Sequence, residues 1–588
     1  MIQMQSADNP GLLARRFTTE ERKMPDQAAN ASQKLILDRI QDHAEAHPQR
    51  VFLSQPVGGG KVVDYTWGEV VDQARRMAAH LQREGFGAGS HIAILSKNCA
   101  HFFIAELAIW MAGGTTVAIF PTESAETIRF VLEHSDSRLL FVGKLDGWPD
   151  QAPGVPAGMP CIALPLAPPT QFPKWDDLIA ASAPLAGRPA RKPDDLAILM
   201  YTSGSTGRPK GVMHNFGRIS RAAQLAAENI GRRMPAGVPW RMLSYLPLAH
   251  VFERAVIECM SWWHGNVHVY FAESIHTFVA DLQRARPTFF VSVPRLWLKF
   301  QQGVFAKVPP KKLDRLLKIP ILGGLVRRKV LKGLGLDQVH LAFSGSAPIP
   351  PELIAWYRKL GLQLFEGYGM TEDFAYSHAS TEEANEPGYV GVPFEGVEVK
   401  IGEDDEVLIK SPGQMVGYYK QPDLTEAAFT PDGFFRTGDR GERRPNGLLK
   451  LTGRVKELFK TAKGKYVAPA PIENLINEHA MVEMSLVSGV GQPSAYAIVV
   501  LAEDLRPKTT DKSVRARVES EMERLLKNVN AQLSSYEQLQ MIVISQEVWA
   551  IENGFLTPTM KVKRSRIEGA VAEKVEQWYA KGKAVIWS

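Results

Sequence analysis

A run of small, hydroxyl-bearing and basic residues in the first half of the sequence could bind phosphate. It reads Tyr201-Thr-Ser-Gly-Ser-Thr-Gly-Arg-Pro-Lys-Gly211 and follows the apolar residues 196–200. Its hydroxyls, approachable backbone N–H groups and lysine are the donors and the positive charge that a polyphosphate requires. Glycine follows Lys210, so the run is not the Walker pattern G-x-x-x-x-G-K-[ST]. The sequence favours a phosphate loop over a flexible surface loop, and disfavours a P-loop kinase or ATPase.

Five more short motifs occur downstream, and each contains residue types that suit a nucleotide site. They are Ser344-Gly-Ser-Ala-Pro348, Glu366-Gly-Tyr-Gly-Met-Thr-Glu372, Thr437-Gly-Asp439, Gly453-Arg454 and Leu556-Thr-Pro-Thr-Met-Lys561. In type, order and spacing the six motifs resemble those of the adenylate-forming superfamily, which includes acyl-CoA synthetases, non-ribosomal adenylation domains and luciferases. The resemblance implies that a carboxylate attacks the α-phosphorus of ATP and expels pyrophosphate, and that a thiol then displaces AMP.

The resemblance also implies a role for individual residues. Catalytic residues would be Lys561, Thr371, Glu372 and His250. Residues that bind the nucleotide would be Thr202, Ser203, Gly204, Ser205, Thr206, Gly207, Lys210, Gly345, Ser346, Ala347, Glu366, Gly367, Tyr368, Gly369, Asp439 and Arg454. Thr206 and Glu372 would hold Mg²⁺, a hard cation that prefers oxygen ligands. The implied cofactors and cosubstrates are ATP, Mg²⁺ and CoA.

Several of these residues have a plain structural alternative. Tyr368 would lie against the adenine, but an isolated tyrosine more often packs in a core. Asp439 would accept from both ribose hydroxyls, since a carboxylate can accept two donors. Lys561 would neutralise charge between the carboxylate and the α-phosphate, and its alternative is an exposed basic strip over residues 561–566. Lys456 aligns with the hinge of the superfamily, around which the smaller domain rotates.

Three segments are most similar to long-chain fatty acyl-CoA synthetases: Leu246-Pro-Leu-Ala-His-Val-Phe-Glu-Arg254, Phe434-Phe-Arg-Thr-Gly-Asp439 and Leu556–Arg564. His250 would then lie near the acyl pocket or its gate, or be an ordinary core histidine. The sequence departs from that branch at Gly453-Arg-Val-Lys456, where Asp-Arg-Lys-Lys is usual. We therefore expect a medium- or long-chain fatty acid and CoA as substrates. The alternatives are a fatty acyl-AMP ligase that loads a carrier protein and a non-catalytic nucleotide-binding, membrane-associated protein.

The pattern of apolar residues predicts an α/β fold. Helices are expected at 67–82, 100–111 and 125–134, with strands at 91–95, 115–119, 139–142, 197–201, 289–293 and 340–343, an alternation typical of a parallel sheet. The Pro-rich residues 149–173 are expected to form a surface excursion, and residues 388–419 a smaller β unit. After Arg454 the pattern predicts helices at 471–479 and 513–533, strands at 485–490, 495–501 and 541–545, and a last helix. These assignments divide the chain into an N-terminal AMP-binding domain, residues 1–455, and a mobile α+β domain, residues 456–588.

Composition excludes some classes of protein. With 45% hydrophobic and 22% charged residues over 588, the chain has the composition of a globular protein rather than a disordered one. Cys99, Cys161 and Cys259 lie far apart, which disfavours disulfide frameworks and cysteine-rich zinc sites. The first residues lack the pattern of a secretory signal, so we expect a cytoplasmic protein. The apolar residues 102–120 contain Glu106 and a Gly-Gly-Thr-Thr break, which indicates a buried helix, turn and strand rather than a membrane span.

The net charge of +6 is too small to imply a nucleic-acid partner, and none is expected. It is concentrated between positions 307 and 332, where nine basic residues accompany a single acid, Asp314. The nine are Lys307, Lys311, Lys312, Arg315, Lys318, Arg327, Arg328, Lys329 and Lys332. Because leucine, isoleucine and valine are interleaved with them, the segment predicts either a solvated helical insertion or peripheral contact with an anionic membrane. A homodimer is a further open expectation.

Overall fold

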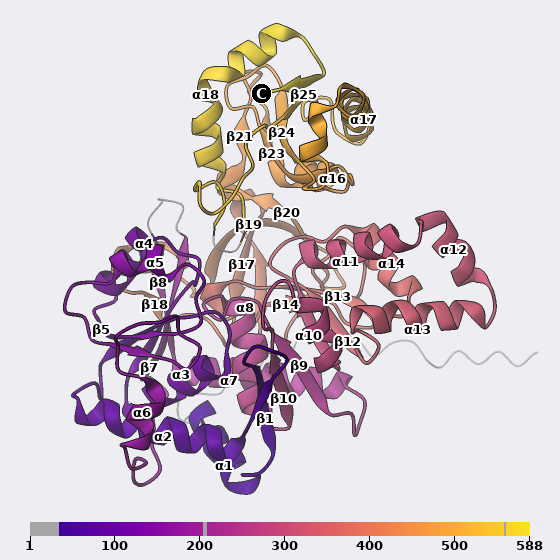
Figure 1. Cartoon of the computed structure of the whole chain (residues 1–588). Coiled ribbons are helices and arrows are strands. Elements are labelled where there is room, and N and C mark those ends of the chain that lie inside the picture. Colours follow the sequence, from indigo (N-terminus) through magenta and orange to yellow (C-terminus); the bar gives the residue numbers. More distant parts are fainter. Residues whose placement is uncertain (1–33, 204–208, 558–559) are drawn as a thin grey trace, which may run out of the picture. The chain divides into compact units, whose positions relative to one another are not determined.

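The computed structural model describes residues 34–203, 209–557 and 560–588. A seven-stranded sheet has the order β18-β8-β7-β4-β3-β5-β6. Its strands β5, β7, β8 and β18 are labelled in Figure 1. Its strands are β3 (His91–Leu95), β4 (Thr115–Ile119), β5 (Ser137–Val142), β6 (Cys161–Ala163), β7 (Leu196–Ser203), β8 (Pro209–Asn215) and β18 (Gly417–Tyr418). The strands β3 to β7 pair in parallel, whereas β8 and β18 join antiparallel at one edge.

Three further sheets lie before residue 455. A four-stranded sheet, in the order β2-β1-β10-β9, contains β1 (Val51–Pro56), β2 (Val62–Thr66), β9 (Trp240–Ser244) and β10 (Val267–Phe271). A five-stranded sheet contains β11 (Phe289–Ser292), β12 (Leu341–Ser344), β13 (Leu364–Tyr368), β14 (His378–Ala379) and β15 (Val392–Pro393). An antiparallel sheet contains β16 (Glu398–Ile401), β17 (Glu406–Lys410), β19 (Phe435–Arg443) and β20 (Leu449–Arg454).

Helices accompany these sheets along the chain. In the first half they are α1 (Ile36–Ala46), α2 (Trp67–Arg83), α3 (Ala100–Ala112), α4 (Ala125–His134), α5 (Trp148–Gln151), α6 (Trp175–Ala180), α7 (Phe216–Arg233), α8 (Val251–Glu253), a π-helix (Arg254–Cys259) and α9 (Met260–His264). They are followed by α10 (Phe278–Ala285), α11 (Pro294–Lys307), α12 (Pro310–Lys318), α13 (Leu322–Leu334), α14 (Pro351–Lys359) and α15 (Pro422–Ala427). Short 3-10 turns occupy 152–154, 371–373, 403–405, 455–457 and 506–510.

Helix α3 explains the long apolar stretch of the sequence. All its residues are buried, including Glu106, and it contacts β1 of one sheet and β3 and β4 of another. A helix enclosed on all sides needs no polar face. It ends at Gly113, whose φ of 100° is a left-handed conformation that glycine adopts without strain. The predicted buried helix, turn and strand are therefore confirmed. Among the described residues, no helix is both long and apolar enough to cross a membrane.

The residues after 458 form their own cores. An antiparallel pair, β21 (Phe459–Lys460) and β22 (Tyr466–Val467), precedes a sheet of β23 (Val482–Ser488), β24 (Ala495–Leu501), β25 (Leu539–Ile544) and β26 (Val585–Trp587). Residues of α16 (Pro469–Asn477) and α17 (Lys512–Asn530) pack on one face of this sheet, and residues of α18 (Arg564–Lys581) on the other (Figure 1). Alternate residues of β24 enter the two cores, as the pleat of a strand requires.

The structure corrects three expectations. Residues 149–173 are not only a surface excursion, because Cys161–Ala163 is buried and pairs in parallel with β5 as the edge strand of the large sheet. The smaller β unit is not confined to 388–419: it includes β19 and β20, whereas β15 and β18 join other sheets. After the last helix, β26 adds a strand. Each error concerns a strand of two or three residues or a pairing distant in sequence, which local patterns do not reveal.

Candidate active site

The first motif lies between two paired strands. Strands β7 and β8 pair antiparallel, with Thr202 opposite Lys210 and Ser203 opposite Pro209. The connection between them, with the predicted nucleotide-binding residues Gly204, Ser205, Thr206 and Gly207, lies outside the described residues. Thr202 Oγ1 is buried without a hydrogen-bond partner in the described part of the chain. The hairpin therefore brings Lys210 back beside the start of the motif.

Lys210 and Glu372 meet through a tyrosine that sequence reasoning missed. Lys210 Nζ donates to the Tyr418 hydroxyl over 2.7 Å, and that hydroxyl donates to Glu372 Oε1 over 2.8 Å. Lys210 Nζ also lies 3.3 Å from Glu372 Oε1 and 4.0 Å from the centroid of the Tyr418 ring. Tyr418 reaches this position because β18 pairs with β8 across about two hundred residues of sequence. The phenol of Tyr418 thus joins the Glu372 carboxylate to Lys210, the lysine that is predicted to bind phosphate.

The turn after β13 positions the Glu366–Glu372 motif. Gly369 has no room for a side chain, because a Cβ there would lie 2.8 Å from the Ala375 backbone. Asp373 Oδ1 accepts from the Met370 N–H at 2.9 Å and closes the turn. Buried His214, whose pKa is lowered to about 4 by desolvation, donates from Nε2 to the Thr371 carbonyl at 2.8 Å. The backbone that carries Thr371 and Glu372 is therefore fixed from two sides.

The Ser344–Pro348 motif begins at the end of β12, which pairs with β13. The Gly345 N–H donates to the Ser292 carbonyl at 3.1 Å, and a Cβ at Gly345 would lie 3.1 Å from the Phe252 ring. Ser346 has a φ of 69°, a left-handed conformation that is uncommon outside glycine, and Ala347 is exposed. The motif therefore turns sharply where β12 ends.

Two residues of the β13 motif differ in their surroundings. The Glu366 side chain is buried and accepts from the backbone N–H groups of Gly388 and Ile349, and burial raises its pKa to about 8. Glu366 thus holds neighbouring loops together. Gly367, the next residue, has ample space around its Cα.

Asp439, Arg454 and Tyr368 form a compact cluster. Asp439 and Arg454 are direct cross-strand partners in β19 and β20, and Arg454 Nε lies 2.9 Å from Asp439 Oδ1. The Tyr368 hydroxyl donates to Asp439 Oδ2 at 2.7 Å. Burial raises the pKa of Asp439, and the Arg454 charge opposes that rise. A carboxylate offers about four acceptor positions, so Asp439 keeps acceptors for two further hydroxyl donors.

Lys561 lies within electrostatic reach of this cluster. Its backbone N–H donates to Thr557 Oγ1 at 3.0 Å, and its carbonyl accepts from the Thr557 N–H at 2.8 Å. Although the residue is exposed overall, surrounding protein atoms desolvate its ammonium group and lower its pKa. Arg454 lowers that pKa further, whereas Asp439 and Glu372 raise it. The two positive and two negative groups therefore share one region, although Lys561 is 107 positions from Arg454.

His250 interacts electrostatically with Lys561. Desolvation lowers its pKa to about 3, and the Lys561 charge lowers it further, so the imidazole is neutral at physiological pH. Its Nδ1 accepts from the Phe252 N–H at 3.2 Å, and its ring lies 6.5 Å from the Phe120 ring. His250 therefore combines an apolar neighbour with proximity to Lys561, as a residue between an acyl chain and a reacting carboxylate would.

Asn98, which the sequence did not single out, holds the segment before His250 together with Glu253 and Arg254. Asn98 Nδ2 donates to the Leu246 carbonyl at 2.6 Å, and Asn98 Oδ1 accepts from the Leu248 N–H at 3.2 Å. Arg254 Nε donates to the Leu248 carbonyl at 2.9 Å. Glu253 Oε1 accepts from Asn98 Nδ2 at 3.1 Å. The Glu253-Arg254 pair closes the motif that suggested the subfamily, but only the fold shows which atoms it binds.

Lys456 is exposed in the 3-10 turn of residues 455–457, directly after β20 ends at Arg454. Such a short turn between two elements can absorb a change in backbone angles. The hydrophobic clusters of the residues from 459 onward contain no member from the described residues earlier in the chain. The hinge and the boundary at 455/456 stay predictions.

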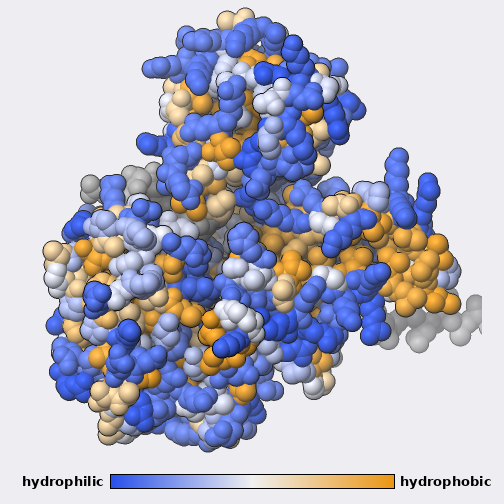
Figure 2. Space-filling model, viewed as in Figure 1, coloured by the Kyte–Doolittle hydropathy of each residue, from blue (hydrophilic) through white to orange (hydrophobic). Residues whose placement is uncertain are grey.

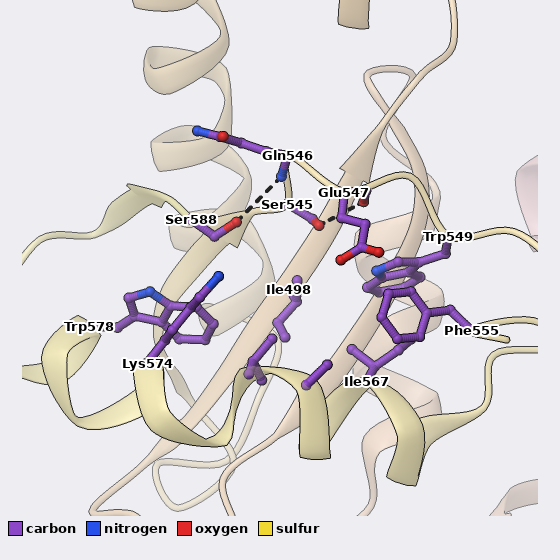
Figure 3. A pocket seen from close by; sticks show the side chains of 12 residues that line it. Ile498, Ser545, Gln546, Glu547, Trp549, Phe555, Ile567, Lys574, Trp578 and Ser588 are labelled. Carbon is purple, nitrogen blue, oxygen red and sulfur yellow. Dashed lines mark hydrogen bonds between the residues drawn. The ribbon is translucent and has the colours of Figure 1, made fainter. Parts of the chain in front are cut away.

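A separate pocket lies in the C-terminal part of the chain. It has a volume of about 150 Å³ and lies between β24, the end of β25 and α18, with Ile498, Phe555 and Ile567 in its apolar part (Figure 3). Glu547, near Trp549, and Lys574, beside Trp578, also line it. None of the predicted site residues that the structure describes lines it.

The oxygen chemistry of Glu372 suits Mg²⁺, which prefers carboxylate and phosphate ligands. Its carboxylate is partly buried and is held by Lys210 and Tyr418. Thr206, the other predicted ligand, is outside the described residues. In the described ranges no cluster of three or more histidine, cysteine or acidic side chains could form an all-protein metal cage. Glu372 therefore fits a metal that takes most of its ligands from a bound phosphate group.

Comparison with known proteins agrees with this geometry. A family model described as AMP-binding enzyme matches residues 40–419, and one described as AMP-binding enzyme C-terminal domain matches residues 457–583. A long-chain-fatty-acid–CoA ligase of Mycobacterium bovis is 30% identical over 92% of this chain and 96% of its own length. Long-chain-fatty-acid–CoA ligase 1 of Homo sapiens is 28% identical over 88% of this chain and 83% of its own.

Solved structures show the same fold. The adenylation domain of a carboxylic acid reductase from Segniliparus rugosus superposes with a TM-score of 0.77 at 22% identity, over 95% of this chain and 96% of that one. O-succinylbenzoate coenzyme A synthetase from Bacillus subtilis gives a TM-score of 0.69 at 22% identity, over 90% of this chain and 98% of that one. With more than half of its length matched by one family model, the chain belongs to the AMP-binding, adenylate-forming enzymes and resembles their long-chain-fatty-acid–CoA ligases.

Proposed function

We propose that this chain is an AMP-forming acid–thiol ligase that activates a medium- or long-chain fatty acid. In the first half-reaction the fatty carboxylate attacks the α-phosphorus of ATP, and pyrophosphate leaves to give acyl-AMP. In the second, the CoA thiol attacks the acyl carbon and AMP leaves to give acyl-CoA. The observation that carries the proposal is the electrostatic interaction of Lys561 with Glu372, Asp439, Arg454 and His250. The similarity to long-chain-fatty-acid–CoA ligases along nearly the whole chain supports the acyl class.

Adenylation brings two anions together, so its catalysis depends on positioning and charge neutralisation. The Lys561 ammonium group would neutralise charge that develops between the carboxylate and the α-phosphate. Thr371 would donate its hydroxyl to the α-phosphate from a backbone that His214 fixes. Lys210 would leave its link to Glu372 and bind phosphate oxygens, since charge-assisted bonds to phosphate are strong.

The Asp439 cluster would bind the nucleoside. Asp439 would accept from the ribose hydroxyls, with Tyr368 and Arg454 fixing its two oxygens. The Tyr368 ring would lie against the adenine. Because Arg454 ends β20 and is followed by the proposed hinge at Lys456, movement of residues 456–588 would couple nucleotide contacts to the thiol step.

A bound Mg²⁺ would supply charge neutralisation at the phosphates. Glu372, and Thr206 as proposed from the sequence, would hold it. The Tyr418 hydroxyl orients the Glu372 carboxylate through its 2.8 Å hydrogen bond, and the Met415 N–H donates to the Glu372 carbonyl at 2.7 Å.

The acceptor thiol and the partners are further parts of the proposal. Transfer to a carrier protein instead of CoA would use the same adenylation residues, and comparing CoA-dependent AMP release with loading of a phosphopantetheinyl carrier separates the two. A homodimer stays a prediction. Peripheral association with an anionic membrane is proposed because the fatty substrate partitions into membranes and because the positive charge gathers in residues 307–332.

Half-reaction assays test the catalytic role of Lys561. K561A should lower fatty-acid-dependent pyrophosphate release by about a hundredfold or more, the scale expected when a preorganised charge is lost. Thioester formation from supplied acyl-AMP and CoA should stay nearly unchanged, because that step forms no bond to the α-phosphate. K563A is the matched control, since Lys563 is also exposed and lies two positions away. Equal loss of both half-reactions in K561A, or a loss in K563A as large as in K561A, would contradict the assignment.

A further inference from the structure

The positive charge that the sequence concentrates in residues 307–332 is fully displayed on the surface. All nine basic side chains of this segment are exposed. In the described part of the chain none of the nine forms an ion pair, whereas the single acid, Asp314, lies 3.7 Å from Lys359 Nζ. Surface charges elsewhere are commonly paired, as Arg188 is with Asp42 and Glu45. The segment therefore presents nine cations that have no ion-pair partner among the described residues.

In the link between α12 and α13 and in the first turn of α13, large aliphatic side chains are exposed among these cations. Ile321 is 87% exposed, Leu325 61%, Ile319 46% and Leu322 39%. We call residues 319–325 the aliphatic corner. Figure 2 shows an orange surface beside blue side chains over the helices labelled α12 and α13 in Figure 1. Single exposed aliphatic residues are ordinary, but four within seven positions form a patch that water does not favour.

The aliphatic corner is a tight and strained turn. Ile321 has φ 62° and ψ −54°, and the Leu322 N–H donates to the Pro320 carbonyl at 2.7 Å. This is a γ-turn of the rare form, and a β-branched residue at its centre is unfavourable. A Cβ at Gly323 would lie 2.5 Å from the Leu317 carbonyl, so glycine is required where α13 meets α12. The fold thus holds a strained isoleucine out in water, a combination that often marks a functional surface.

The opposite face of the two helices fixes the aliphatic corner to the protein. Leu313, Leu317 and Leu334 are buried in the cluster that contains Trp297 and Tyr357. The exposed aliphatic residues therefore contribute little to packing, and they are presented on a firm support.

We propose that the aliphatic corner inserts into the interfacial layer of an anionic membrane while the nine surrounding basic residues bind lipid headgroups. Insertion of aliphatic side chains together with attraction of lysine and arginine to anionic lipid is the usual basis of peripheral binding. Residues 307–332 contain no aromatic side chain for base stacking, so the pattern fits a lipid surface better than a single-stranded nucleic acid. The proposal deepens the proposed function, because a fatty acid that the enzyme activates would be taken up where it is concentrated.

Binding to vesicles tests the two components separately. The protein is sedimented with vesicles of phosphatidylcholine alone or mixed with phosphatidylglycerol, at about 0.05 M and about 0.5 M NaCl, because salt screens the headgroup contribution. One variant, K311Q/K312Q/R327Q/R328Q, removes charge. A second, I321S/L325S, removes the aliphatic side chains. Its matched control is I275S/V490S, because Ile275 and Val490 are 84% and 62% exposed but lie elsewhere.

Wild-type protein should bind the anionic vesicles, and higher salt should weaken the binding. Each lost cation is expected to cost about fivefold in affinity, so the quadruple variant should bind at least about a hundredfold more weakly. I321S/L325S should lose about tenfold or more, because two aliphatic contacts are gone, and I275S/V490S should bind as wild type does. A fluorophore on L325C should shift to the blue on anionic vesicles; the three native cysteines are buried, which directs the label to position 325.

Several results would overturn the proposal. Equal binding by I321S/L325S and wild type, or an unchanged label spectrum, would exclude insertion. Equal binding to phosphatidylcholine alone would exclude the role of the cations. If wild type were a dimer that I321S/L325S converts to a monomer without loss of vesicle binding, the aliphatic corner would be a contact between subunits. AMP release from a soluble medium-chain acid with CoA is measured on the same samples, so failure of the ligase function is seen in wild type independently of vesicle binding.

Discussion

Arg254 and the basic residues of α12 and α13 carry the same charge in opposite surroundings. Arg254 is fully buried and is paired with Glu106, and its Nε lies 3.3 Å from Glu258 Oε2. The nine cations of residues 307–332 are exposed and, within the described ranges, form no ion pair. A buried charge must be paired to exist at all, whereas an exposed charge costs little and stays available to a partner. The first arrangement therefore serves the fold, and the second serves an interaction.

The surroundings of the buried cluster favour the protonated form of its carboxyl groups. Burial raises the pKa values of Glu106 and Glu258, and their mutual repulsion adds to the rise for Glu258. Two carboxyl groups share one arginine, so the cluster stays close to neutral when one of them keeps its proton. Through Arg254, which donates to the Leu248 carbonyl, it fixes the segment that leads to His250.

Removing the buried cation should give the largest effect on stability. R254M leaves the ionised carboxyl group of the Glu106–Glu258 pair without a counter-charge in the core, and we expect a loss of about 3–5 kcal/mol in the free energy of unfolding. Urea unfolding followed by tryptophan fluorescence measures it. In the triple variant E106Q/R254M/E258Q no buried charge is left unpaired, so much of the loss should be recovered. A change below about 1 kcal/mol in R254M would show that the cluster is not the structural charge described above.

The buried carboxyl of Glu253 predicts a pH dependence of smaller size. Burial raises its pKa to about 8, from an ordinary value of 4.5. Between these values the unfolded chain has lost the proton that the folded chain keeps, so stability falls as the pH rises, by at most about 1.4 kcal/mol per pH unit for one group. Below pH 6.5 buried histidines with lowered pKa values, such as His101, act in the opposite direction. The clear window is therefore pH 6.5 to 8.

E253Q tests this dependence through a slope rather than an absolute stability. Urea midpoints of wild type and E253Q are compared at pH 6.5 and pH 8. Tyr245 and Glu258 are the other titratable groups that interact with Glu253, and neither is changed. The decline of the urea midpoint with pH should be shallower in E253Q. The decline that remains in E253Q is expected from Glu366, whose pKa is also raised to about 8. Parallel declines would show that Glu253 does not carry the proton.

Some of these features could be predicted from the amino-acid sequence, and others could not. The exposed basic segment could be predicted by counting charged residues, because residues that are close in sequence also lie close together on two short helices. The strand-turn motifs at Ser344 and Glu366 could also be predicted, because each is formed by consecutive residues. The roles of Tyr418 and Asn98 could not be predicted, because a tyrosine in a two-residue strand and an asparagine before a helix have no local sequence signature. Their contacts with Glu372 and with the Leu246–His250 segment depend on pairing between distant strands and helices.

Neutralising the exposed cations should change stability least. In K311Q/K312Q/R327Q/R328Q no buried group loses a partner, so the free energy of unfolding should change by no more than about 0.5 kcal/mol for each substitution, with either sign. A small gain is the expected direction, because four like charges that repel one another are removed. Urea unfolding of this variant and of R254M compares, in one assay, the loss of four surface charges with the loss of one buried charge. A loss of stability as large as that of R254M would mean that the exposed cations stabilise the fold. The distinction between Arg254 as a structural charge and the exposed cations as charges that bind a partner would then be wrong.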